Sequence, residues 1–167
     1  EGGGTKRGES YVIFGSTNLG SSGAVSIATF NGTNGFQMNG VTDNDESGNA
    51  LGGGVDINGD GVTDLIIGAY YADYNATNAG AAYLVFGGSS VGSGGSVSLS
   101  ALNGTTGYRL KGVSASDHTG YSVDLVGDIN GDGKGDIIIG AYLNDAGGTD
   151  KGRAYVVFGG SHLATLD

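Results

Sequence analysis

Two acidic loops of the same design occur in this chain, 72 residues apart. The first runs from Asp56 to Asp64 with the sequence DINGDGVTD, and the second runs from Asp128 to Asp136 with the sequence DINGDGKGD. Each loop has an oxygen-bearing side chain at positions 1, 3, 5 and 9 and a glycine at position 6. Ca²⁺ is a hard cation that takes roughly six to eight oxygen ligands, and alternate positions of a tight loop can point inward together. The spacing therefore predicts one calcium site in each loop.

The predicted ligands are side-chain oxygens and one backbone carbonyl in each loop. Gly61 and Gly133 supply the sharp reversal, most easily with a positive φ angle. The carbonyl of the next residue then serves as a ligand, which explains why its side chain can differ between the loops. The closing aspartate of each loop is expected to bind with both oxygens. The two predicted ligand sets are Asp56, Asn58, Asp60, Val62 and Asp64, and Asp128, Asn130, Asp132, Lys134 and Asp136.

A hairpin turn is the alternative explanation of these loops, because Asn-Gly and Asp-Gly are strong turn signals. A turn explains positions 3 to 6 only, and it gives no reason for the flanking Asp56 and Asp64 or for their return 72 residues later. Three carboxylates in one loop would also repel each other without a cation between them. Ca²⁺ is favoured over Mg²⁺, which prefers to keep water ligands and a rigid octahedral geometry.

The rest of the chain repeats with the same spacing, so each repeat is expected to be one supersecondary unit. The segment Tyr11–Gly15 matches Tyr83–Gly87 and Tyr155–Gly159. Four short strands per repeat are predicted, with the acidic loop between the first and the second. The expected strands are, in order, Leu51–Val55 or Val123–Gly127, Asp64–Ala69 or Asp136–Ala141, Ala82–Gly87, and Gly35–Asn39 or Gly107–Lys111.

The second and third strands have consecutive apolar residues, as in Leu65–Ile67, Ile137–Ile139 and Val156–Phe158. Both faces of such strands are expected to be covered. Four-stranded antiparallel units packed face to face are the blades of a β-propeller, so the predicted fold class is all-β with about two blades present. The Gly/Ser-rich stretch 87–98 is expected to be a flexible connection.

The strand pattern divides the chain into three units. Residues 1–47 form a partial blade with its third and fourth strands, residues 48–119 a complete blade with the first calcium loop, and residues 120–167 a partial blade with the first to third strands and the second loop. An open array would expose apolar faces and unpaired strand edges. The missing strands are therefore expected from the same longer chain or from other copies of this chain.

Composition excludes several classes of partner. The 167 residues have a formal net charge of −10, which argues against binding nucleic acid, and no stretch is apolar enough to insert into a membrane. The chain has no cysteine, so disulfides cannot stabilise it. Sequons at Asn31, Asn75 and Asn103 would be glycosylated only in a secretory pathway that performs this modification.

The loops and their flanks resemble FG-GAP repeats, the units of the integrin α-subunit propeller and of many bacterial surface proteins. The resemblance rests on Gly120-Tyr121, on the acidic loop and on Gly140-Ala141-Tyr142. The chain departs from the family pattern at Asn49, which replaces an aromatic residue, and at Tyr70 and Tyr142, which replace a proline. The resemblance implies a calcium-bearing propeller segment in an extracellular or cell-surface protein.

The predicted function is adhesion, or a scaffold that binds a protein or glycan. The alternatives are a non-catalytic propeller domain of a larger secreted hydrolase or lyase, and a structural subunit of a self-assembling filament or ring. No enzyme activity is expected, because neither His118 nor His162 lies in a Ser/His/Asp pattern. Both histidines, and the acidic residues Asp43, Asp45, Glu46 and Asp117, are expected in solvated loops.

Overall fold

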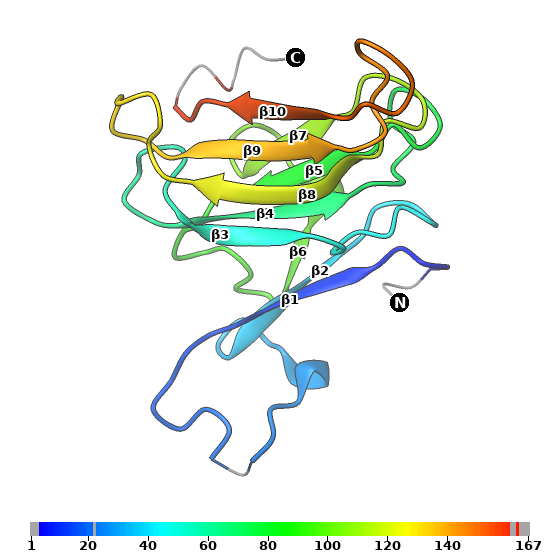
Figure 1. Cartoon of the computed structure of the whole chain (residues 1–167). Coiled ribbons are helices and arrows are strands. Elements are labelled where there is room, and N and C mark those ends of the chain that lie inside the picture. The colour runs from blue at the N-terminus through cyan, green and yellow to red at the C-terminus, as the bar shows by residue number, and fades with distance from the viewer. Residues whose placement is uncertain (1–3, 22, 161–162, 164–167) are drawn as a thin grey trace.

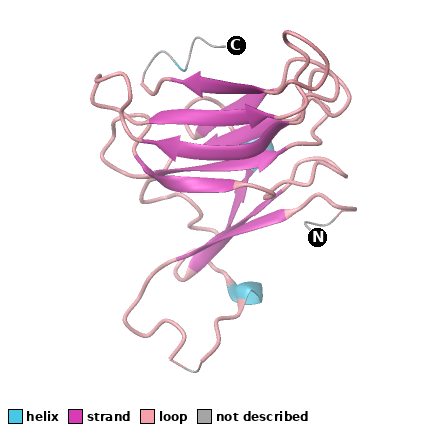
Figure 2. Ribbon diagram, viewed as in Figure 1, coloured by secondary structure: helices cyan, strands magenta, loops and turns pink. Residues whose placement is uncertain are grey.

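The computed structural model describes residues 4–21, 23–160 and 163, and these form three small β-sheets stacked face to face (Figures 1 and 2). In the described part of the chain, helical structure is limited to the short 3₁₀ turns η1 (Ile27–Thr29) and η2 (Leu99–Ala101). The fold class is all-β, as predicted. The strands are β1 (Glu9–Ile13), β2 (Gly35–Asn39), β3 (Leu51–Val55), β4 (Asp64–Ala69), β5 (Ala81–Val85), β6 (Ser96–Ser98), β7 (Gly107–Lys111), β8 (Thr119–Val126), β9 (Asp136–Ala141) and β10 (Arg153–Val157).

The middle sheet is a four-stranded antiparallel unit in the order β3-β4-β5-β7. Its inner strands β4 and β5 are paired from Leu65–Val85 to Ala69–Ala81. Every residue of β5 is buried, as are all residues of β4 except the half-buried Leu65. The consecutive apolar residues of these strands therefore have both faces covered, as expected.

The first sheet has the order β1-β2-β6, and its third strand differs from the sequence-based expectation. Within the stretch predicted to be a flexible connection, β6 pairs in parallel with β2, and Met38 lies opposite Val97. The next apolar residue, Leu99, is 1% exposed. The stretch is ordered at this end because Val97 and Leu99 cover the groove between the first sheet and the middle sheet.

The third sheet has the order β10-β9-β8 and packs on the middle sheet (Figure 1). Its first strand is longer than predicted, because β8 begins at Thr119 and contains an irregularity between Thr119 and Ser122. β9 and β10 are antiparallel, with Ile139 opposite Tyr155. Like the sheet before it, the third sheet has one acidic loop, which lies here between β8 and β9.

Among the described residues, two apolar cores lie between the sheets. The first joins the first sheet to the middle sheet and includes Phe36, Met38, Ile67 and Tyr83. The second joins the middle sheet to the third sheet, and its fully buried members include Ile57, Ile66, Leu84 and Ile137. The middle sheet therefore contributes residues from one face to the first core and from its other face to the second core.

The outer face of the third sheet is open, which corrects the expectation that the inner strands of every repeat are covered on both sides. Ile138, Val156 and Phe158 are 38%, 46% and 45% exposed. The corresponding residues one repeat earlier, Ile66 and Leu84, are 0% exposed. The residues at these positions are apolar in both repeats. The difference arises because the third sheet covers Ile66 and Leu84 of the middle sheet, whereas none of the described sheets covers the outer face of the third sheet.

Candidate metal centre

The two acidic loops connect the first strand to the second in the middle and third sheets, so they lie at matching places in neighbouring sheets. Gly61 and Gly133 both have a φ angle of 86°, which confirms the predicted positive φ at position 6. Gly59 and Gly131 share this left-handed region, with φ angles of 83° and 82°. These conformations are easily reached only by glycine, so they let each loop curl tightly around its first aspartate.

The aspartate at position 1 accepts backbone hydrogen bonds from inside its own loop. The Asp56 carboxylate receives the N–H groups of Gly59 at 2.7 Å and of Gly61 at 2.8 Å, and Asp128 receives the equivalent groups at 2.6 and 2.7 Å. Burial raises the pKa of Asp56, but the N–H donors outweigh it, and the pKa lies below its ordinary value. For Asp128 the N–H of Gly133 is the largest cause of a similarly lowered pKa.

Positions 3 and 5 are joined by side-chain hydrogen bonds. The amide of Asn58 donates to the Asp60 carboxylate at 3.0 Å, while the oxygen of Asn58 accepts the Asp60 backbone N–H at 2.9 Å. Asn130 and Asp132 have the same two contacts at 3.0 and 2.9 Å. Asp56 also accepts the Asp60 N–H, at 3.2 Å, so the side chains of positions 1, 3 and 5 lie within one turn of chain.

The aspartate at position 9 has a different environment, because it is fully buried. Asp64 accepts the backbone N–H of Ile57 on one oxygen and that of Gly87 on the other, both at 2.8 Å. Burial raises the pKa of Asp64 even though these bonds act to lower it. The negative charges of Asp60 and Asp56 raise the Asp64 pKa further. The acids of one loop therefore lie close enough to repel each other.

The donor set suits a hard divalent cation. Each loop offers carboxylate and amide oxygens, and the calcium ion prefers such ligands. An ionised carboxylate has about four lone-pair positions, so the two N–H bonds to Asp64 leave capacity for a metal. A cation among these groups would also offset the repulsion that raises the pKa of Asp64. In the described part of the chain, no three Asp, Glu, His or Cys side chains already converge in a metal-binding cluster.

The two loops touch each other, which sequence reasoning did not predict. The backbone N–H of Gly135, in the second loop, donates to the carbonyl of Asp56, in the first loop, at 2.9 Å. The Lys134 ammonium lies next to Gly59, since a Cβ on that glycine would be 2.7 Å from Nζ. Lys134 also helps to lower the pKa of Asp56. Lys134 was predicted as a carbonyl ligand of its own loop, and its side chain additionally supplies positive charge to the neighbouring loop.

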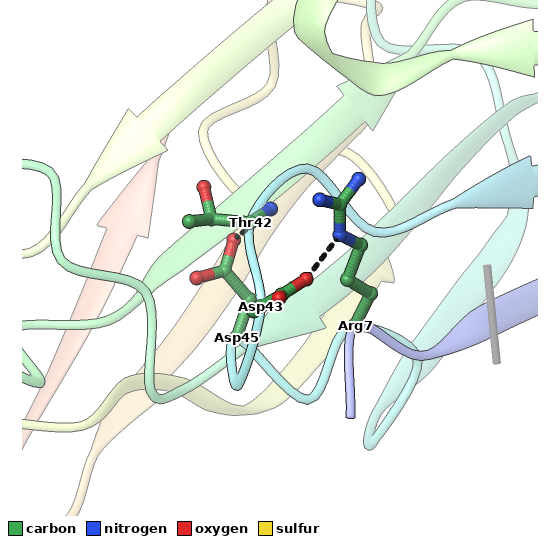
Figure 3. Close-up of polar contacts among 4 residues, drawn as sticks. All are labelled: Arg7, Thr42, Asp43 and Asp45. Atoms are coloured by element: carbon green, nitrogen blue, oxygen red, sulfur yellow. Dashed lines mark hydrogen bonds and ion pairs between the residues drawn. The ribbon is translucent and has the colours of Figure 1, made fainter. Parts of the chain in front are cut away.

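The acidic residues before the first strands are also partly misjudged from sequence. Asp45 and Asp117 are each 2% exposed and accept the backbone N–H of the residue three positions earlier, Thr42 at 3.0 Å and Ser114 at 3.1 Å. Burial raises the pKa of Asp45. The neighbouring Asp43 has a side-chain partner: the Nε of Arg7 donates a hydrogen bond to its carboxylate at 2.6 Å (Figure 3). Asp45 and Asp117 therefore close turns instead of lying in solvent.

An aromatic cluster joins the middle and third sheets beyond the ends of β4 and β9. His118 was expected in a solvated loop, but it is buried, with 7% exposed. Its Nδ1 lies 3.1 Å from the Tyr142 hydroxyl. Tyr70 contacts Tyr121 edge-on, with ring centroids 5.3 Å apart. His162 lies outside the described residues. The sequence gives one sign of this cluster, because Tyr70 recurs as Tyr142 in the next repeat. The burial of His118 depends on contacts between sheets, which the sequence does not reveal.

Stacked antiparallel sheets with one acidic loop per repeat define a repeat-built β-protein of the propeller-blade class. The FG-GAP repeat family model matches residues 47–85 and 119–157, so the chain contains two FG-GAP repeats. Each matched range holds three strands and one acidic loop. The family predicted from the sequence is thus confirmed. No curated protein matches the chain. Across the described residues, neither 3₁₀ turn has the length or apolar character to cross a bilayer.

Proposed function

We propose that this chain is a calcium-stabilised extracellular FG-GAP propeller segment that acts in adhesion, or as a scaffold for a protein or glycan ligand. The observation behind the calcium proposal is that each loop joins its side chains at positions 3 and 5 by a hydrogen bond and ends at a buried aspartate at position 9. Asp56, Asn58, Asp60, the carbonyl of Val62 and Asp64 would hold one ion. Asp128, Asn130, Asp132, the carbonyl of Lys134 and Asp136 would hold the other.

The proposed role of calcium is structural. Asp64 links its loop to Gly87, which lies just past the end of β5, so stabilising the loop also stabilises three strands of one sheet. An ion that binds only the folded state adds RT ln(1 + [L]/Kd) to the free energy of unfolding. For a site of about 10⁻⁴ M at millimolar calcium, this is about 1 to 2 kcal/mol per site. Two such sites would compensate for the absence of disulfides.

The extracellular assignment has two supports. FG-GAP repeats are typical of extracellular proteins, and calcium sites of this affinity would be filled where calcium is millimolar. Repeats of this family generally serve as binding or scaffold units, so we propose a non-catalytic role. The ligand itself would bind to loops at one end of the stacked sheets.

The open face of the third sheet supports a further part of the proposal, that an adjacent blade packs there. Ile138 and Val156 are partly exposed, whereas Ile66 and Leu84, one repeat earlier, are buried against the next sheet. The adjacent blade would come from the same longer chain or from another copy of this chain. If the blade comes from another copy, the chain would be a subunit of a self-assembling filament or ring, because the open face of each copy would bind the next copy.

A thermal melt with calcium, with magnesium and with a chelator tests the calcium proposal. Calcium is expected to raise the melting temperature by about 5 to 10 °C relative to chelator if both sites fill, and magnesium is expected to raise it much less. The same samples should be examined by light scattering, so that a change in oligomeric state is not mistaken for a change in folding. A melting temperature that is unchanged by calcium would contradict the proposal.

A further inference from the structure

The side chain of Lys134, in the second acidic loop, extends across the first acidic loop. A Cβ added to Gly59 would lie 2.7 Å from the Lys134 Nζ, 3.5 Å from its Cε and 3.7 Å from its Cγ. Gly59 stands between Asn58 and Asp60, which are proposed as ligands of the first calcium ion. The ammonium of one repeat therefore lies beside the acidic loop of the repeat before it.

Backbone hydrogen bonds hold the two loops in this arrangement. The residue after Lys134 is Gly135, which is buried and donates its N–H to the Asp56 carbonyl at 2.9 Å. Gly160, a little beyond the end of β10, donates its N–H to the Ile57 carbonyl at 2.9 Å. Two points of the last repeat are thus attached to the first loop, so the backbone that carries Lys134 has a fixed position relative to Asp56.

The position-7 residues of the two loops differ in charge and in direction. Val62 is the counterpart of Lys134, and its Cγ1 would lie 2.7 Å from a Cβ added to Gly87, in its own repeat. Lys134 instead reaches the neighbouring repeat, at Gly59. Because only the backbone carbonyl of this position is proposed as a calcium ligand, the side chain is left for a separate role.

The charge of Lys134 acts on the first loop in two opposite ways. Without metal, the ammonium attracts the carboxylates of the loop, and this attraction helps to lower the pKa of Asp56. It thereby offsets part of the repulsion among the acids of the loop. With metal, the ammonium is a like charge for the divalent ion and repels it. Lys134 is half-buried, so water and salt screen both effects only in part.

We propose that Lys134 sets the calcium affinity of the first loop from its position in the second loop. The ammonium weakens calcium binding there and supports the loop when calcium is absent. The inference rests on the proposed calcium function, and it adds that the affinity of one site is determined by the neighbouring repeat. Position 7 of the second loop thus has two roles, because its carbonyl would bind one ion while its side chain would act against the other.

Calcium titrations followed by two-dimensional NMR test the proposal, because they report each loop separately in the intact protein. The amide signals of Gly61 and Gly133 serve as reporters of the first and the second loop. Lys134→Gln removes the charge, keeps much of the side chain and retains the backbone carbonyl. We expect the dissociation constant at Gly61 to fall about fivefold, because the repulsion is removed, and the constant at Gly133 to change by less than about twofold.

Two control variants separate the position of the charge from its mere presence. Lys134→Arg keeps a cation at the same place and should bind calcium as the wild type does, within about twofold. Lys151→Gln removes one positive charge from the exposed segment between β9 and β10, at the other end of β9 from the second acidic loop, and should leave the constant at Gly61 unchanged. Raising the salt to about 1 M should reduce the effect of Lys134→Gln, because the Debye length falls to about 3 Å.

Thermal melts supply a second readout of the same variants. In chelator, Lys134→Gln is expected to lower the melting temperature by about 1 to 2 °C, because the first loop loses its compensating cation. The rise that saturating calcium causes is expected to be about 2 to 4 °C greater in this variant than in the wild type, as a site about fivefold tighter requires. The Lys151→Gln control should show neither change.

The results distinguish a failure of this inference from a failure of the calcium proposal. If neither Gly61 nor Gly133 shifts with calcium up to about 10 mM, the calcium proposal is wrong and this inference is overturned with it. If both signals shift but the affinity at Gly61 is the same in the wild type and in Lys134→Gln, the inference alone is wrong. An equal gain in affinity at both loops, or an equal gain in Lys151→Gln, would show an effect of net charge and would also overturn the inference.

Discussion

The buried carboxylate of Asp64 accepts a 2.8 Å hydrogen bond from the backbone N–H of Gly87, 23 residues further along the chain. The same relationship joins Asp136 to Gly159 at 2.9 Å. In each sheet the last residue of the acidic loop is thereby attached to the chain just beyond the third strand. The position-9 aspartate is thus part of the sheet framework, whereas positions 1, 3 and 5 lie within the loop itself. This division leads to different predictions for the two kinds of acid.

Substituting Asp64 should destabilise the protein even without metal. Asp64→Asn removes one of the two acceptors that satisfy Ile57 and Gly87, and it leaves a buried N–H unpaired. Relief of the buried charge offsets part of this cost, so we expect a net loss of about 1 kcal/mol in the free energy of unfolding. Urea denaturation in chelator measures it. Asp60→Asn, at an exposed position of the same loop, is the control and should change stability by less than about 0.5 kcal/mol. Equal losses in both variants would contradict this division of roles.

Each acidic loop should account for one bound calcium ion. Asp60→Ala removes the proposed position-5 ligand from the first loop only, and Asp132→Ala does the same in the second. Isothermal titration is expected to detect both ions in the wild type, a single ion in each variant and none in the double variant. Asp150→Ala, an exposed acid outside both loops, should leave the wild-type stoichiometry unchanged. If either single variant still bound both ions, the ligand assignment would be wrong.

The contact between the middle and third sheets should be sensitive to one glycine. A Cβ added to Gly68, on β4, would lie 2.1 Å from the backbone oxygen of Gly120, on β8. The sheets would have to separate, so Gly68→Ala is expected to cost about 3 kcal/mol in the free energy of unfolding. Gly127→Ala is the matched control, because a Cβ there meets no atom within 4 Å. Chemical denaturation of both variants measures the difference, and similar values would rule out a tight approach of the sheets at Gly68.

Stability should fall in mildly acidic solution because of His118. Burial lowers the pKa of this side chain in the folded protein, although the charge of Asp117 acts in the opposite direction. The unfolded chain therefore binds a proton more readily, and stability is lost as the pH falls below the ordinary histidine pKa of about 6.5. His118→Gln removes this titration. We expect the stability difference between wild type and variant to shrink as the pH is lowered from 7.5 to 5, and a difference that stays constant would show that His118 does not titrate on unfolding.

The open face of the third sheet should govern self-association. Phe158→Lys and Ile138→Lys place charges on side chains that are 45% and 38% exposed, so folding should tolerate them. If another copy of the chain packs on this face, sedimentation velocity is expected to show a loss of oligomer in both variants. Leu19→Lys, at a 46% exposed position far along the chain from the third sheet, should behave as the wild type does. Oligomers that survive both face variants would place the contact elsewhere.

Much of the fold follows from local patterns in the sequence. The predicted bounds of β2, β3, β4, β7 and β9 agree with the structure, because short apolar runs between glycine-rich turns have few other ways to be satisfied. The positive φ of Gly61 and Gly133 was also predictable, since a loop that returns its position-9 acid to a strand must turn sharply. In both cases the information lies within a few residues.

Other features were decided by contacts between distant parts of the chain. β6 has little apolar pattern of its own, and it forms because Val97 reaches β2 and Leu99 completes a core. Asp45 and His118 are buried by neighbouring turns and rings, which their loop-like sequence does not reveal.

The sharpest case is the pair Ile66 and Ile138, which occupy the same place in two nearly identical repeats. The sequence by itself determined the repeat, most of the strands and the sharp turns of the acidic loops, since these depend on neighbouring residues. The tertiary structure decided that Ile66 is buried and Ile138 is open, because burial depends on whether another sheet lies against that face.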